Sequence, residues 1–202
     1  MADDASRPWR CFWAVPLPDE LREQLASFVA DVRTQPGVDA AWRFTEPEGW
    51  HVTLAFLGAV EPEAVEPMVA RVVTAVAGTR GFEVSSCGLG GFPRGNRARV
   101  MWYGVADERK ELAQLAAAVH LASGIAGEQA FRAHVTLARS RDRHGTSLPA
   151  TAMKMPQGRI PVDATLLYRS HLGRGPARYR VLARVPLAAA SVVPSPPLSA
   201  AR

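Results

Sequence analysis

The chain has few cysteines and no long apolar segment. Its 202 residues include only Cys11 and Cys87, each inside an apolar stretch, so we expect two buried free thiols rather than a disulfide framework. No run of about 18 apolar residues occurs, which argues against a membrane-spanning helix. Residues 1–7 open with acidic residues and lack the basic start and apolar centre of a signal peptide. We therefore expect a cytoplasmic protein without membrane attachment.

Two common kinds of cofactor site are also missing from the sequence pattern. Cysteines and histidines at the close spacing of a zinc site do not occur. The glycine-rich segment 88–93 is not followed by a helical pattern, so it does not match a nucleotide-binding fingerprint, and a turn or bulge is the better interpretation. We expect neither a metal nor a cofactor.

Lysine is scarce, and arginine supplies nearly all the positive charge. The net charge is +5, with Lys110 and Lys154 the only lysines, and the pI is near 9.9. Because the planar guanidinium can hold two phosphate oxygens at once, arginine clusters favour an anionic partner. A solvated basic surface is an alternative of equal weight for each cluster. The clusters are Arg94, Arg97 and Arg99; Arg139, Arg141 and Arg143; and Arg174, Arg178 and Arg180.

Hydrophobic periodicity predicts interleaved strands and helices. The expected order is strand, helix, strand, helix, strand, strand, helix and three strands, which favours an α+β fold over a doubly wound parallel sheet. The helices are expected to start near Pro18, Glu61 and Asp107. Their expected buried faces are Leu21, Leu25, Phe28, Val29 and Val32 in the first; Val65, Met68, Val69, Val72, Val73 and Val76 in the second; and Leu112, Leu115, Ala116, Val119 and His120 in the third.

One short sequence occurs twice at strand length. Residues 51–55 and 134–138 both read HVTLA. Because strand side chains alternate between faces, His51 and Thr53 point the same way, as do His134 and Thr136. If the two strands are neighbours, two imidazoles and two hydroxyls converge on one cleft. The remaining histidines have no such twin, and we expect structural or surface roles for them; they are His120, His144 and His171.

Acid–base catalysis suits this set of side chains best. Metal binding needs three or four ligands, and a threonine nucleophile needs a base oriented by a carboxylate, but neither motif contains a carboxylate. An imidazole has a pKa near neutrality, so one can remove a proton from water while the other protonates a leaving oxygen. Threonine hydroxyls and arginines would hold the phosphate oxygens. The pattern predicts metal-free hydrolysis of a phosphodiester.

The sequence resembles the 2H phosphoesterase superfamily and, within it, the bacterial RNA 2',3'-cyclic phosphodiesterases, also called 2'-5' RNA ligases. The resemblance runs from about residue 10 to residue 187. It implies a bilobal α+β fold with two pseudo-symmetric lobes of antiparallel sheet, helices packed outside and a central cleft. We expect one such domain over residues 1–187 and a disordered Ala/Ser/Pro-rich tail over 188–202. The matching segments are CFWAVP (11–16), TLAFLG (53–58), GLGGFP (88–93), FRAH (131–134) and residues 170–187.

This resemblance also implies roles for single residues. His51 and His134 would be the acid–base pair, Thr53 and Thr136 the phosphate holders, and Arg139 a further phosphate contact. The reaction would open an RNA terminal 2',3'-cyclic phosphate to a 2'-phosphomonoester. By the same resemblance, His134 would activate water and His51 would protonate the departing ribose O3'. The reverse reaction would join RNA ends through a 2'-5' bond.

Three positions around the motifs raise questions. Strict alternation turns Arg139 away from His134, so its role requires a bend at the strand end. Phe56 is the candidate for stacking on a nucleobase, yet the same parity favours the core. Ala133 stands where the family usually has proline, which could loosen the entry to the strand but removes no reacting group.

The implied partners are RNA ends that carry a 2',3'-cyclic phosphate, with tRNA fragments among the candidates, and we expect a monomer. Two alternatives stay open. One is a 2H enzyme acting on a small cyclic nucleotide or another cyclic phosphodiester. The other is an RNA-end-binding module without turnover, against which the presence of all four motif residues argues.

Overall fold

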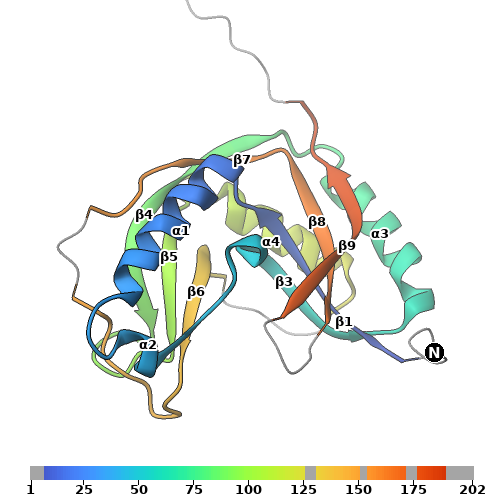
Figure 1. The fold of residues 1–202 in the computed structure, drawn as a ribbon. Helices are drawn as coiled ribbons and strands as arrows, with labels where there is room; N and C mark the ends of the chain where they lie inside the picture. The colour runs from blue at the N-terminus through green and yellow to red at the C-terminus, as the bar shows by residue number, and fades with distance from the viewer. Residues whose placement is uncertain (1–6, 126–130, 151–153, 172–176, 190–202) are drawn as a thin grey trace, which may run out of the picture.

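One curled antiparallel sheet organises the computed structural model, which describes residues 7–125, 131–150, 154–171 and 177–189 (Figure 1). In these ranges the sheet has nine strands in the order β7-β4-β5-β6-β3-β1-β8-β9, with β2 pairing β6 off this path. The strands are β1 (Trp9–Pro16), β2 (Trp42–Phe44), β3 (His51–Val60), β4 (Phe82–Phe92), β5 (Val100–Ala106), β6 (His134–Ser140), β7 (Arg159–Val162), β8 (Ala164–His171) and β9 (Arg178–Pro186).

The strand order divides the sheet into two halves of four strands. One half runs outward from β3 through β1 and β8 to β9, and the other runs from β6 through β5 and β4 to β7. The central strands β3 and β6 are antiparallel and register through Val52 and Val135. The two halves therefore correspond strand by strand about the middle of the sheet. This confirms the predicted α+β class with two similar halves of antiparallel sheet.

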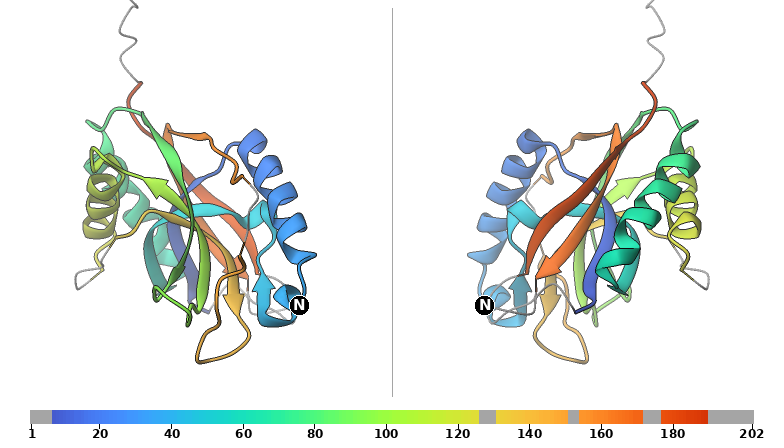
Figure 2. Two further views of the ribbon diagram at one scale, coloured as in Figure 1. Left: turned by 90° about the vertical axis from the view of Figure 1, so that its left-hand side faces the viewer. Right: turned by 90° about the vertical axis from the view of Figure 1, so that its right-hand side faces the viewer.

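Helices cover both sides of this sheet. The described residues form the helices α1 (Asp19–Arg33), α2 (Val38–Ala41), α3 (Pro62–Val76) and α4 (Glu111–Ala122) and a 3-10 turn, η1 (Pro47–Gly49). The views of Figure 2 place α1 and α2 on one side and α3 and α4 on the other. Among the described helices, none combines the length and the apolar character needed to cross a bilayer.

The periodicity of the sequence located the three long helices correctly. All five apolar residues predicted to face the core in α1 are buried. In α3 the buried residues are Met68, Val72 and Val76, whereas Val73 is 47% exposed, because it lies one position around the helix from that face. The carboxylate of Asp107 accepts hydrogen bonds from the backbone N–H of Leu112 and Ala113, at 3.0 and 2.8 Å, and so caps α4 as predicted.

Three short elements were not predicted from the sequence. The elements α2, β2 and β7 have three or four residues each, too few to show a period. The glycine-rich segment lies within β4, where a register shift between Ser86 and Gly88 and a φ of +102° at Gly88 form the bulge that was one of the two interpretations. The expected burial of both thiols is wrong for Cys87, which is exposed while Cys11 is buried. Alternation along β4 explains this, because Cys87 shares the exposed face of Glu83 and Ser85 while Val84 and Ser86 are buried.

The end of the domain packs against the chain before β4. Leu187 is buried, and Ala188 forms an isolated parallel bridge with Arg80. Residues 190–202, most of the expected tail, lie outside the described residues.

Candidate active site

The two HVTLA copies lie side by side at the centre of the sheet. Val52 pairs with Val135, and both are buried. Continuing this antiparallel register by one residue each way sets His51 opposite Thr136 and Thr53 opposite His134. These four side chains are partly buried and share the face opposite to the two valines. The predicted convergence of the two motifs is therefore present, and a pseudo-twofold axis passes between the valines.

The two imidazoles lie diagonally across this pair of strands. Diagonal neighbours on adjacent antiparallel strands are roughly 7–8 Å apart, a separation that can hold one phosphate group between two rings. The rings also sense each other electrostatically, because the charge of His134 lowers the pKa of His51. Protonation of one ring therefore opposes protonation of the other.

Each ring is oriented by the backbone two residues before it. His51 Nδ1 is 2.6 Å from the carbonyl oxygen of Gly49, and His134 Nδ1 is 2.6 Å from that of Arg132. A carbonyl oxygen can only accept, so in both rings Nδ1 carries the hydrogen and donates it. Nε2 then holds the lone pair in the neutral form and is the atom that can exchange a proton with a substrate.

Aromatic rings surround His51. Phe12 on β1 stacks on it with centroids 4.6 Å apart, Tyr179 on β9 meets it edge-on at 5.4 Å, and Tyr168 on β8 lies 6.0 Å away. Burial in this cluster lowers the pKa of His51 to about 4, against the opposing effect of the bond to Gly49. His51 is therefore neutral at neutral pH in the free protein.

His134 has a different and thinner aromatic neighbourhood. Phe92 meets it edge-on at 5.0 Å, and Trp102, which pairs with Thr136, lies 5.2 Å from Phe92. The indole of Trp102 covers Gly90 and Gly104, where a Cβ would lie 2.2 and 2.9 Å from the ring. Burial lowers the pKa of His134, the bond to Arg132 raises it, and the charge of Arg139 lowers it.

A β-bulge in β3 decides where Phe56 points. Thr53 pairs with Ala14 and Ala55 pairs with Trp13, so Leu54 is an extra residue in the ladder. Leu54 and Ala55 are both buried, and Phe56 is 52% exposed. The parity expectation that placed Phe56 in the core is therefore wrong, because the bulge returns Phe56 to the face of His51 and Thr53. Its ring lies 6.2 Å from Phe12.

A matching bulge in β6 brings Arg139 to the same face. Thr136 pairs with Trp102 and Ala138 pairs with Met101, which leaves Leu137 as the extra residue. Arg139 is exposed, and its charge lowers the pKa of both His134 and Tyr179. This bulge is the bend that a role for Arg139 requires, and it places the guanidinium within electrostatic reach of both halves of the site.

The other histidines, for which structural or surface roles are expected, lie on other parts of the fold. His120 is on α4, His144 is exposed in the segment after β6, and His171 is exposed at the end of β8. Arg174 lies outside the described residues. In the part of the chain that the structure describes, no three His, Cys, Asp or Glu side chains gather as metal ligands would.

Several residues that line the site were not predicted from the sequence. They come from the other strands of the two halves of the sheet, β1, β8 and β9 in one half and β4 and β5 in the other. The sequence carries one signal for them. Small residues across neighbouring strands leave room for a large ring, as Gly90 and Gly104 do for Trp102. The missed residues are Phe12, Phe92, Trp102, Tyr168 and Tyr179.

Comparison with known proteins gives consistent matches. The family model described as LigT-like phosphoesterase matches residues 15–102. The RNA 2',3'-cyclic phosphodiesterase of Methanothermobacter thermautotrophicus is 32% identical over 170 residues, covering 81% of this chain and 90% of that protein. The protein of the same description from Geobacillus stearothermophilus is 28% identical and covers 87% of this chain, which spans 56% of that protein's length.

Solved structures match as well. The apo structure of Escherichia coli LigT superposes with a TM-score of 0.71 and 28% identity, covering 91% of this chain and 99% of that chain. A structure of E. coli LigT complexed with 3'-AMP matches with a TM-score of 0.70. The similarity therefore includes both halves of the sheet, well beyond the region of the family model.

Proposed function

The chain belongs to the LigT-like phosphoesterase family and carries two His-x-Thr motifs. On this basis we propose that it opens RNA terminal 2',3'-cyclic phosphates. The product is a 2'-phosphomonoester, and the reaction needs no metal. The observation that carries the proposal is the rectangle of His51, Thr53, His134 and Thr136 about the Val52–Val135 pair. Two relatives of this chain bear the name RNA 2',3'-cyclic phosphodiesterase.

The reaction follows from two Nε2 atoms on opposite sides of one phosphorus. One neutral imidazole takes a proton from water as the water oxygen bonds to phosphorus. The P–O3' bond breaks, and the other imidazole gives its proton to O3'. Thr53 and Thr136 donate hydroxyl hydrogen bonds to the non-bridging oxygens, and Arg139 offsets their negative charge.

For one histidine to act as the acid, its ring must be protonated before the P–O3' bond breaks. By the family resemblance, His134 is the base and His51 the acid. The pKa of His51 near 4 leaves its ring neutral in the free protein at neutral pH. His51 therefore gains its proton only when the anionic substrate binds, because the phosphate charge raises its pKa. A neutral His134 helps, since it no longer repels a proton on His51.

The aromatic half of the site supports a nucleotide substrate. Phe56 is exposed beside Phe12 and offers a ring on which a terminal base stacks, which requires no particular sequence. The substrates in the cell would be RNA ends such as tRNA fragments, and the protein would act as a monomer in the cytoplasm. The same site would join RNA ends when an RNA 5'-hydroxyl replaces water as the nucleophile. The 5' oxygen then bonds to phosphorus, the P–O3' bond breaks with protonation of O3', and a 2'-5' linkage results.

The test uses an RNA oligonucleotide that ends in a 2',3'-cyclic phosphate, incubated with EDTA and with product mapping. The proposal expects a 2'-phosphate product from the intact protein, formed about 10²–10⁴-fold more slowly by His51→Ala or His134→Ala. RNA binding without turnover would replace the enzyme by a binding module. Turnover of free nucleoside 2',3'-cyclic phosphates without turnover of RNA would move the substrate to small cyclic nucleotides.

A further inference from the structure

We propose that Arg43 is a second phosphate contact, which binds the backbone phosphate on the 5' side of the terminal nucleotide. The site would thereby select RNA chains over free nucleoside 2',3'-cyclic phosphates. This inference rests on the proposed function and adds a specificity residue to it. Four observations carry it: the strand register, the exposure of the side chain, the absence of a carboxylate partner among the described residues, and the local scaffold.

The register sets two arginines directly opposite each other. Arg43 on β2 pairs with Arg139 on β6. Directly opposed residues of an antiparallel pair share one face, with Cβ atoms about 4.5–5.5 Å apart. The bulge at Leu137 aims Arg139 at the catalytic face, so Arg43 faces the same way. Both side chains are exposed, whereas Trp42 beside Arg43 is buried.

The position of β2 places Arg43 beside the two motif strands. β6 pairs with β3 at Val135 and with β2 from Ala138 to Ser140. The strand β2 thus takes the edge of β6 that β3 leaves. Arg43 therefore stands beside the group assigned to the reacting phosphate, at the point where the two halves of the sheet separate.

Two like charges in this arrangement are unfavourable without an anion. Opposed like charges on neighbouring strands destabilise a sheet. Among the described residues, carboxylates pair with Arg22, Arg33, Arg159 and Arg184, but with neither Arg43 nor Arg139. A bound phosphate, or two successive phosphates of one strand, would offset this repulsion.

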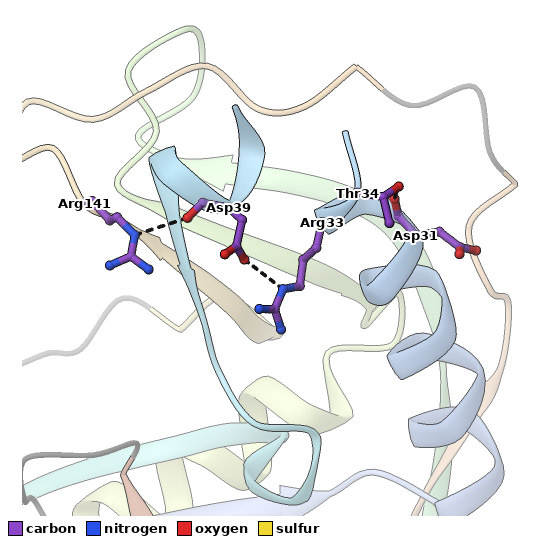
Figure 3. Close-up of polar contacts among 5 residues, drawn as sticks. All are labelled: Asp31, Arg33, Thr34, Asp39 and Arg141. Atoms are coloured by element: carbon purple, nitrogen blue, oxygen red, sulfur yellow. Dashed lines mark hydrogen bonds and ion pairs between the residues drawn. The ribbon is translucent and has the colours of Figure 1, made fainter. Parts of the chain in front are cut away.

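Two neighbouring arginines, Arg33 and Arg141, are bound to the residue Asp39 of the scaffold (Figure 3). Arg33 donates to the Asp39 carboxylate at 2.9 Å, and Arg141 donates from Nε to the Asp39 carbonyl at 3.3 Å. The backbone N–H of Arg141 also donates to the carbonyl of Ala41 at 2.9 Å. These contacts hold α2 and the start of β2 against the end of β6. They fix the backbone around Arg43, whose own side chain is exposed.

The test compares three substrates that end in the same cyclic phosphate. The first is the free nucleoside 2',3'-cyclic phosphate. The second is a dinucleotide with a normal charged linkage and a 2'-deoxy first residue, so that the linkage itself is inert. The third is the same dinucleotide with a neutral methylphosphonate linkage. The measured quantity is kcat/KM for each, and its ratio between the charged and the neutral dinucleotide.

We expect Arg43→Gln to lower that ratio by about tenfold to a hundredfold, since a charge-assisted hydrogen bond contributes on this scale. Arg43→Lys should fall between, because it keeps the charge and loses the fork. Arg109→Gln is the matched control: Arg109 is exposed in the turn before α4, at the far end of β5 from Val100, which pairs with Arg139. It should leave the ratio as in the parent protein.

Stability separates binding from a structural role. Removal of one of two opposed like charges should leave the thermal midpoint equal or higher, whereas loss of a structural contact lowers it. An unchanged ratio, an equal loss on all three substrates, or a lower midpoint in Arg43→Gln overturns the inference while the proposed function stands. If the parent protein turns over none of the three substrates, the proposed function fails and takes this inference with it.

Discussion

The two central strands read alike for five residues and differ at the sixth. After HVTLA, β3 continues with Phe56 and β6 with Arg139. A bulge after each threonine brings both sixth residues to the face that carries the histidines. The shared residues form a nearly symmetric frame for chemistry at one phosphorus atom. The sixth residue makes the frame directional, with an aromatic side for a base and a cationic side for phosphate.

The histidines themselves differ through what surrounds them. His51 lies among Phe12, Tyr168 and Tyr179, whereas His134 meets Phe92 and senses the charge of Arg139. Identical motifs therefore do not give identical acidities. The lesson is that duplication supplies the reacting groups, while the flanking strands of each half set their proton affinities.

The largest expected effect is on kcat of the two histidine variants, measured on substrates whose leaving groups differ in their need for protonation. His51→Ala and His134→Ala should each lower kcat on cyclic-phosphate RNA by about 10²–10⁴-fold. On a nitrophenyl phosphodiester, whose leaving oxygen departs without protonation, the defect of His51→Ala should shrink by about tenfold or more, while that of His134→Ala persists.

The comparison of the two variants contains its own control, because each variant is measured on both substrates. An undiminished defect for His51→Ala on the nitrophenyl ester contradicts its role as acid. A defect that shrinks for His134→Ala instead would exchange the two roles.

A second test compares the histidines through stability against pH. The folded-state pKa of His51 is about 4, below the 6.5 of an unperturbed histidine, so between these values the unfolded chain binds more protons than the folded one. The free energy of unfolding should therefore be constant above about pH 7 and should fall by about 2–3 kcal/mol as pH drops from 6.5 to 4.

Urea unfolding of the parent protein, His51→Gln and His134→Gln checks this expectation. His51→Gln should remove most of the fall. The pKa of His134 is also lowered, and we expect His134→Gln to remove a smaller part. Parallel curves for the parent protein and His51→Gln would show that burial does not hold His51 neutral.

The sequence allowed prediction of the long helices and of the two central strands, because their patterns lie within a few neighbouring residues. The helical faces of α1 and α4 repeat at 3.6 residues, and most of these residues are buried as expected. The HVTLA repeat identified the two strands that meet at the centre. Identical residues with the same alternation needed only an antiparallel pairing to bring the histidines and threonines together.

Strict alternation alone misplaces side chains where their direction depends on a partner strand. Phe56 and Arg139 face the site because β1 and β5 each oppose one fewer residue than β3 and β6 supply, and nothing within HVTLAF or HVTLAR states that register. The aromatic cluster at His51 joins β1, β8 and β9, which are far apart in the chain. The three residues of β2 are too few to show alternation, so the facing pair of Arg43 and Arg139 was not visible in the sequence.

A third test removes the cationic side of the frame. Arg139→Gln should lower kcat/KM by about tenfold to a hundredfold on charged and neutral-linked substrates alike, because Arg139 is assigned to the reacting phosphate that all of them share. It should also raise the pKa of His134, whose proton affinity the arginine charge reduces. An NMR titration of the His134 ring measures the second effect. A loss confined to the charged dinucleotide would give Arg139 the role proposed here for Arg43.

The smallest expected effect concerns the aromatic side. Phe56→Ala should raise KM for RNA ends by about tenfold, the scale of one base stacking on an aromatic ring, with little dependence on which base is terminal. Phe56 is 52% exposed, so its removal should leave the thermal midpoint nearly unchanged. Val73→Ala, at 47% exposure on α3, is the matched control for loss of exposed apolar surface. If Phe56→Ala lowers kcat with KM unchanged, Phe56 positions His51 through Phe12 instead of binding a base, and the two sides of the frame would then differ in catalysis and not in recognition.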